Sequence, residues 1–142
     1  MSWIEPKTTW NGRDNEYFDI DIDYPRIKEN ILHLQNLFDT VFFDNSSAYY
    51  QMGNYSYNSI PYVDFFNNIV YNIDTIKNGL NKVNVDVKDY NYLRTYYENQ
   101  SIWDYNDLNK IEQNISILKK QMEKYEKAKR KLPIKLGIRS VF

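Results

Sequence analysis

The segment DYPRIKENILHLQNLFDTV, residues 23–41, decides the fold class of this chain. Its apolar side chains alternate spacings of three and four residues, which places them on one face of a helix: Tyr24, Ile27, Ile31, Leu34, Phe38 and Val41. Asp21 and Asp23 stand at its start, where negative charge favours the first turn, and Pro25 is tolerated only within that turn. The segment predicts a helix that begins close to Pro25 and ends at about residue 43.

Two further long helices and one short helix are predicted from the same spacing. The second long helix follows Ser59 and Pro61 and buries Val63, Phe66, Val70, Ile73, Ile76, Leu80 and Val83. The last one buries Leu108, Ile111, Ile115, Leu118, Met122, Tyr125 and Leu132 and is expected to end at Pro133. Asp86 and Asp89 indicate the start of the short helix, whose buried face is Val87, Tyr90, Leu93 and Tyr97.

These elements predict an all-α helical bundle of three long helices and one short helix, in which two long helices are antiparallel. Residues 1–19 lack helical periodicity and are expected to form an extended N-terminal arm. Residues 20–142 form a single helical domain with a basic C-terminal helix and tail. Alternation of Ile134, Leu136 and Ile138 indicates a short extended tail.

The 142-residue sequence lacks the recognisable motifs of enzyme active sites and metal sites. It contains no cysteine, and its single histidine, His33, has no neighbouring ligand or nucleophile. Asp19, Asp21 and Asp23 resemble the opening of a calcium loop, but Tyr24 and Asn30 stand where glycine and glutamate are required. There is no glycine-rich phosphate loop and no apolar run near the ~18 residues of a membrane span. The sequence predicts a non-enzymatic protein without cofactor, metal or membrane span.

Charge is distributed unevenly along the chain. Residues 119–142 carry nine Lys/Arg and two Glu, a net +7, whereas residues 1–118 carry nine Lys/Arg and seventeen Asp/Glu, a net −8. The basic segment has three interpretations: a solvated helix face, a contact with the acidic body of a neighbouring copy, or a nucleic-acid site. The sequence pI of about 5.8 and the lack of a base-reading motif count against nucleic acid.

A tyrosine-rich loop separates the first two long helices and contains Tyr49, Tyr50, Tyr55 and Tyr57. Aromatic side chains with small polar neighbours form adaptable contact surfaces, so the loop could bind a host glycan or a partner chain. The alternative is a lid whose rings pack back on the bundle, and this is the interpretation we favour.

Two of the predicted helices begin with related sequences. Residues 23–34 and 107–118 share Asp, Ile, Asn, Ile and Leu at a constant offset of 84, and Arg26 is matched by Lys110. Two amphipathic helices share apolar positions by necessity, but that does not explain the shared Asp and Asn. The match therefore favours an internal duplication of the helix-start motif.

The arm and the helix start together resemble a known pattern. The segments WIEPKTTW (residues 3–10) and DYPRIKEN (residues 23–30) are similar to small virion proteins of phages and prophages of low-GC Gram-positive bacteria. Those proteins carry a Trp-x-x-Pro-Lys-Thr-x-Trp arm and an Asp-x-Asn-Arg-Ile-x-x-Asn-Ile helix start. The copy at 107–115 fits the helix half better, because Pro25 replaces the usual Asn. The resemblance implies a tail, baseplate, fibre-base or collar component.

Such a component would act by assembly in the virion, in a symmetric homo-oligomer and with other virion proteins. The candidate assembly residues are Trp3, Pro6 and Trp10 of the arm and Lys127, Arg130 and Lys131 of the basic helix. The alternative is that the two indoles attach the arm to its own bundle. The alternative functions are receptor or glycan binding through the tyrosine-rich loop and, third, nucleic-acid binding.

Overall fold

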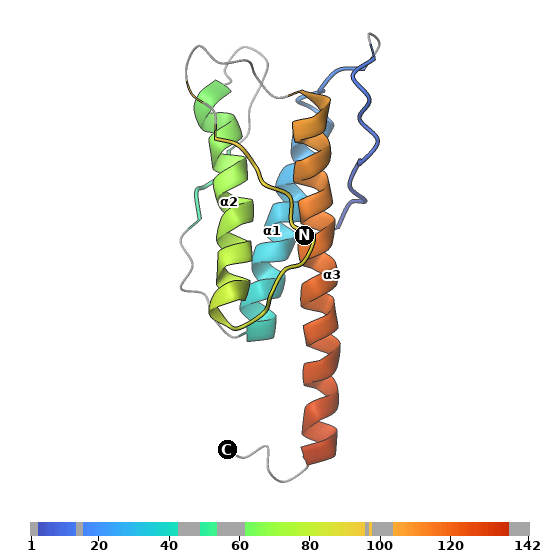
Figure 1. The fold of residues 1–142 in the computed structure, drawn as a ribbon, viewed down its shortest axis with the longest axis vertical. Helices are drawn as coiled ribbons and strands as arrows, with labels where there is room; N and C mark the ends of the chain where they lie inside the picture. Colours follow the sequence, from blue (N-terminus) through green and yellow to red (C-terminus); the bar gives the residue numbers. More distant parts are fainter. Residues whose placement is uncertain are drawn as a thin grey trace.

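The computed structural model of the chain describes residues 3–13, 16–42, 49–53, 62–95, 97 and 104–136, and only the backbone at 62–63 and 129–136. These residues form three helices, α1 (Asp23–Phe42), α2 (Tyr62–Lys82) and α3 (Tyr105–Leu136), and no strand (Figure 1). The all-α prediction and the position of the first helix are confirmed. Ser59 and Pro61, which were expected to start the second helix, lie outside the described residues.

The predicted short helix is wrong. Residues 85–95 contain no helix, and Asn84 and Asp89 have left-handed backbones with φ of 65° and 64°. Val87 and Leu93 are buried as expected, but Tyr97 is 64% exposed. The segment is held extended by hydrogen bonds to α3, described below, and these long-range contacts override the local helical spacing.

The predicted end of the last helix at Pro133 is also wrong, because α3 continues to Leu136. Residues 134–136 are therefore helical and not part of an extended tail, while residues 137–142 lie outside the described part. An internal proline costs a helix about 3 kcal/mol, which is a preference that surrounding helix can outweigh.

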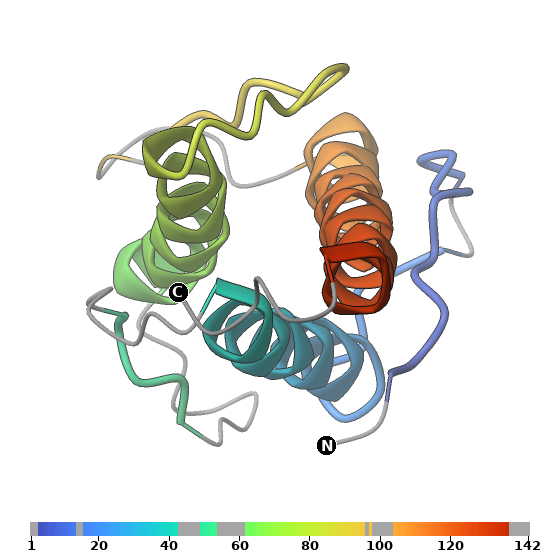
Figure 2. The same ribbon diagram turned by 90° about the horizontal axis from the view of Figure 1, so that it is seen from below.

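All three helices run in the same direction, so the antiparallel prediction is wrong (Figure 1). The rings of Tyr24 and Phe65 lie 4.9 Å apart near the starts of α1 and α2. The rings of Phe42 and Tyr125 lie 6.2 Å apart at the end of α1 and within α3. Seen along the bundle, the arm, segment 49–53 and segment 85–95 lie outside the three helices, each over a different groove (Figure 2).

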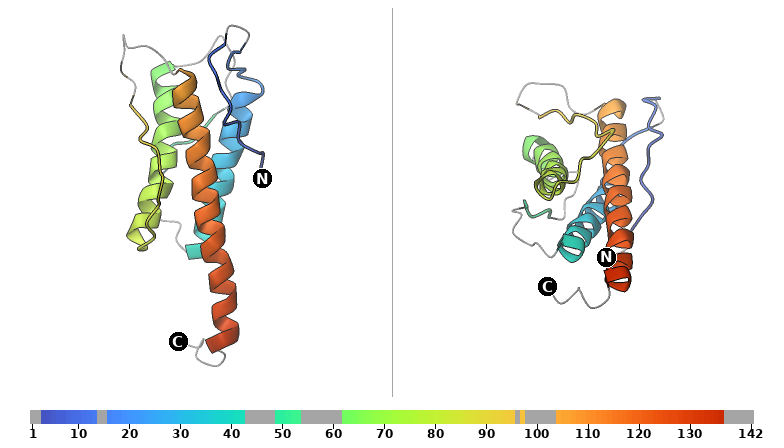
Figure 3. Two further views of the ribbon diagram at one scale, coloured as in Figure 1. Left: turned by 45° about the vertical axis from the view of Figure 1, so that its right-hand side comes forward. Right: turned by 60° about the horizontal axis from the view of Figure 1, so that its bottom comes forward.

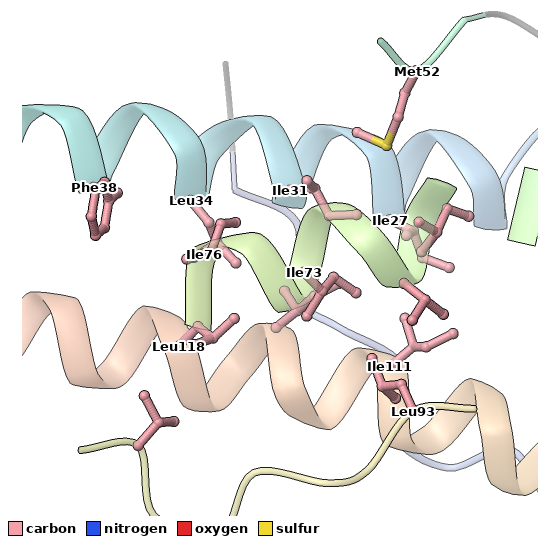
Figure 4. Packing of buried hydrophobic residues seen from close by; sticks show 14 of the residues in the cluster. Ile27, Ile31, Leu34, Phe38, Met52, Ile73, Ile76, Leu93, Ile111 and Leu118 are labelled. Atoms are coloured by element: carbon pink, nitrogen blue, oxygen red, sulfur yellow. The ribbon is translucent and has the colours of Figure 1, made fainter. Parts of the chain in front are cut away.

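The core is built in layers with one side chain from each helix, and equivalent positions are separated by 42 residues. Every one of these side chains is at most 1% exposed: Ile27, Ile69 and Ile111; Ile31, Ile73 and Ile115; Leu34, Ile76 and Leu118; Phe38, Leu80 and Met122. Figure 4 shows several of them pointing toward one another, with Met52 and Leu93 of the extended segments beside them. Of the five residues shared at an offset of 84, the Ile, Asn and Ile also recur in α2 at an offset of 42, as Ile69, Asn72 and Ile73.

The buried face of α2 differs from the predicted one at its start. Phe65 and Ile69 are buried, whereas Phe66 is only half-buried. The sequence places two adjacent phenylalanines there, Phe65 and Phe66. The helical spacing predicted the second of them to be buried, one residue later than the one that the structure buries. The side chain of Val63 lies outside the described residues.

Helix α3 is longer than its two counterparts. At an offset of 84 the last residue of α1 corresponds to position 126, yet α3 continues ten residues further, to Leu136. It therefore projects beyond the ends of α1 and α2 (Figures 1 and 3).

Candidate functional site

Each helix holds an extended segment through one buried asparagine at the same repeat position. In α1, Asn30 Oδ1 accepts the Ile4 backbone N–H at 2.8 Å, and Asn30 Nδ2 donates to the Ile4 carbonyl at 2.6 Å. Asn72 of α2 makes the same pair of bonds with Tyr50, and Asn114 of α3 makes it with Asn91. The three asparagines are completely buried. A buried amide satisfied on both sides fixes the backbone that it grips.

The arm has a second clamp of this kind on α3. The Trp10 backbone N–H donates to Asn109 Oδ1 at 2.9 Å, and Asn109 Nδ2 donates to the Trp10 carbonyl at 2.8 Å. The arm then turns at Gly12, whose φ is +74°; a Cβ there would lie 2.5 Å from the Tyr105 ring. Residues 3–13 therefore lie in the groove between α1 and α3, which we call the arm groove.

Glu112 is the charged centre of the arm groove and is completely buried. Its carboxylate accepts hydrogen bonds from Nε and Nη2 of Arg26 at 2.7 and 2.8 Å. It also accepts the Lys7 backbone N–H and the Trp10 indole N–H, both at 3.0 Å. Arg26 has a second partner in Asp23, at 2.8 Å. The network joins both helices and the arm, and burying such charges is tolerated only because every one is paired.

The structure places the three predicted arm residues against their own bundle. Trp10 is 4% exposed and Pro6 is buried, while Trp3 is half-buried. The Trp3 ring lies 5.5 Å from the ring of His33, and the Lys119 ammonium lies 4.8 Å from the Trp3 centroid. Within one chain, the two indoles attach the arm to the bundle.

The sequence did not single out Glu112 or Asn109. Glu112 belongs to no motif and occupies a polar-looking position of an amphipathic helix. Asn109 is the Asn of the Asp-x-Asn helix-start motif, but the motif does not indicate which segment it holds. The match between Asn30 and Asn114 was the available signal for the asparagines that grip extended segments.

Of the predicted basic assembly residues, Lys127 is exposed on α3, where it lines a shallow surface depression with Lys120 and Lys124. The side chains of Arg130 and Lys131 lie outside the described residues. The structure therefore does not bring the arm residues and the basic residues together as one described site.

Two of the four tyrosines of the predicted loop, Tyr49 and Tyr50, are among the described residues. Tyr49 is half-buried against the core, whereas Tyr50 is 53% exposed. Tyr55 and Tyr57 lie outside the described residues. The Tyr50 ring pairs with that of Tyr71 at 4.5 Å, beside a hollow of about 510 Å³ on the outer face of α2. Apart from Val70, polar side chains line the rest of this hollow, among them Asp64, Asn68, Thr75 and Asn78.

His33 and Asp74 are two of the partly buried groups whose pKa values are shifted. Burial, followed by the charge of Lys119, lowers the pKa of His33. Burial raises the pKa of Asp74, although the hydrogen bond donated by the Tyr90 hydroxyl acts in the opposite direction. Each group touches an extended segment: His33 lies under Trp3, and Asp74 binds Tyr90. Both therefore act in holding segments to helices.

The first-turn acids of α1 hold the start of that helix. Asp23 Oδ2 accepts the Asp19 backbone N–H at 2.7 Å, and Asp19 Oδ1 accepts the Asp21 N–H at 2.9 Å. Within the described ranges, no group of three or more His, Asp or Glu is arranged to hold a metal ion. None of the helices, as far as they are described, combines the length and apolarity that a bilayer crossing needs.

Comparison with protein-family models, with curated proteins and with solved structures found no match to this chain.

Proposed function

We propose that this chain is a non-enzymatic structural protein of a phage particle, a tail, baseplate, fibre-base or collar component that acts by protein–protein assembly. The observation that carries the proposal is the end of α3, which projects ten residues past the level at which α1 ends. The phage context rests on the similarity of the arm and helix-start motifs to small virion proteins. The protein would work in the virion, in contact with its own copies and with other virion proteins.

A projecting helix favours an assembly role for a physical reason. Isolated helices shorter than about 12–15 residues are marginal in water, so most helical stability comes from packing against a neighbour. Neither α1 nor α2 extends along the last ten residues of α3. A neighbouring protein that packs there would supply the missing contact.

Charge indicates the kind of neighbour. Lys120, Lys124 and Lys127 are exposed near this end of α3, in the segment with a net charge of +7. Residues 1–118 of the same chain carry −8, so a second copy offers a complementary surface. Complementary charge orients such docking and makes it sensitive to salt.

The use of buried polar groups also favours a structural role. Asn30, Asn72 and Asn114 each grip a backbone segment, and Arg26 and Glu112 join two helices to the arm. The hydrogen bonds of these buried polar side chains hold the segments and helices of the chain together.

Multi-angle light scattering on the full chain tests the proposal. We expect wild type to form a defined oligomer, and reversal of charge at Lys120, Lys124 and Lys127 to Glu to reduce it to a folded monomer. The matched control reverses three exposed lysines elsewhere, Lys82, Lys88 and Lys110, and should keep the oligomer. A wild-type chain that is monomeric at every concentration, alone and with acidic virion partners, would contradict the proposal.

Glycan binding is a second candidate function, favoured by the exposed Tyr50–Tyr71 pair beside the hollow on α2. Aromatic faces next to amide and hydroxyl groups suit a polyhydroxylated ligand. Titration of soluble cell-wall glycan fragments would test it, with Tyr71→Ala expected to abolish binding. Tyr92→Ala is the control, because Tyr92 is 80% exposed and does not line the hollow.

A further inference from the structure

We infer that the arm groove is a docking site for the N-terminal arm of a second copy of this chain, so that arm exchange links neighbouring subunits. The inference rests on the proposed role in assembly and names the contact that would join the copies. Its occupant is known from the structure, because the arm of the same chain lies in the groove.

The groove recognises an extended peptide mainly through the peptide backbone. It grips the arm at every third residue: Asn30 holds Ile4, Glu112 accepts the Lys7 N–H, and Asn109 holds Trp10. The buried indole of Trp10 adds a side-chain anchor, with its N–H donated to Glu112. None of these contacts requires the peptide to belong to the same chain.

The arm differs from the other two extended segments in how it is attached. Segments 49–53 and 85–95 each lie between two helices in the sequence, so the chain leads to a helix on both sides of them. Among the described residues no helix precedes the arm, and the chain continues from it to α1. Its partners on α3 are 99 to 105 residues away in sequence. The turn at Gly12 lies between the docked residues and α1 and is the natural hinge for exchange.

Exchange would preserve the contacts that residues 4–10 make with Asn30, Glu112 and Asn109. The balance between the closed chain and linked copies would then depend on local concentration. A subunit that gives its arm to one neighbour and receives an arm from another makes a head-to-tail contact. Such contacts close into rings or continue as filaments. Subunits brought together at high local concentration in a particle would therefore be linked without any new interface chemistry.

The test uses wild-type chain in which half the molecules carry nitrogen-15. After incubation at rising concentration, a lysine-specific cross-linker joins Lys7 of the arm to Lys110 and Lys119 of α3, and mass spectrometry counts the isotopically mixed pairs. We expect the mixed share to rise with concentration toward one half, the value for complete exchange. Mixed pairs that stay at background while same-isotope pairs are abundant would overturn the inference.

A complementation experiment adds an independent readout. Trp10→Ala damages the arm, and Glu112→Gln damages the groove; mixing the two variants restores one intact arm–groove pair. Native mass spectrometry should detect the heterodimer, whereas Trp10→Ala mixed with the double variant, which restores none, should not form it. Absence of the heterodimer from folded variants counts against exchange; if the variants do not fold, the isotope experiment decides alone.

The outcomes separate this inference from the proposed function. Oligomers that depend on the lysines of α3 but show no mixed arm–groove pairs would leave the assembly role intact and refute arm exchange. Mixed pairs in a chain whose mass is unaffected by charge reversal on α3 would support exchange and refute the role assigned to the projecting helix.

Discussion

Replacing Glu112 by alanine removes the centre of the arm groove. The carboxylate is completely buried and accepts four hydrogen bonds, two from Arg26 and one each from the Lys7 backbone and the Trp10 indole. The Arg26 side chain is itself only 10% exposed, so Glu112→Ala leaves a largely buried guanidinium with Asp23 as its remaining acidic partner.

The expected loss follows from this burial. Breaking a buried ion pair by removing one partner costs about 3–5 kcal/mol. The two N–H groups of the arm can turn to water if the arm loosens, so their loss adds little. A loss of about 4 kcal/mol is a large part of the 5–15 kcal/mol that stabilises a typical domain. With a urea dependence of about 2 kcal/mol per molar, the unfolding midpoint falls by roughly 2 M.

Urea unfolding followed by circular dichroism and tryptophan fluorescence measures this loss. The control is Glu123→Ala on the same helix, which breaks an i,i+4 pair with Lys119; the Glu123 side chain is 41% exposed. Such a surface pair is worth less than about 1 kcal/mol. Arg26→Ala combined with Glu112→Ala should cost less than the sum of the single changes, because either single change already breaks the Arg26–Glu112 ion pair. Equal costs for Glu112→Ala and Glu123→Ala would refute the reasoning.

Three further outcomes are expected. Gly12 has a positive φ, and a Cβ added there would lie 2.5 Å from the Tyr105 ring, so Gly12→Ala should lower the free energy of unfolding in urea by about 1–3 kcal/mol. A Cβ added at Gly53 has no atom within 4 Å, so Gly53→Ala should change the free energy of unfolding little. Because the folded-state pKa of His33 is lowered, stability should fall as pH drops below 6.5 through that pKa, and His33→Gln should remove the dependence, as NMR titration and unfolding would show. Because the pKa of Asp74 is raised, its contribution is present below pH 3.8 and lost as pH rises through the folded-state pKa. The stability of Asp74→Asn minus that of wild type should therefore increase as pH rises from 3 to 7; a constant difference would contradict this.

Local sequence determined the existence and the inner faces of most of the helices. The spacing from Tyr24 to Val41 correctly predicted α1, and that from Leu108 to Met122 predicted the buried face of α3. Helical periodicity is a property of neighbouring residues, so it can be read without knowing what the face packs against. The 42-residue repeat is also present in the sequence, although only its first and third copies were recognised.

The direction of the helices, the path of residues 85–95 and the arm groove were decided by the tertiary structure. Parallel helices need connections that return along the bundle, and these are held by Asn72 and Asn114 through contacts 22 and 23 residues away in sequence. Asn30 holds the arm in the same way, at a separation of 26 residues. Glu112 finds Arg26 at a separation of 86 residues. The sequence around a polar residue on an amphipathic helix does not indicate which distant residue it will contact. Its role therefore emerges only when folding brings the two together in a place without water.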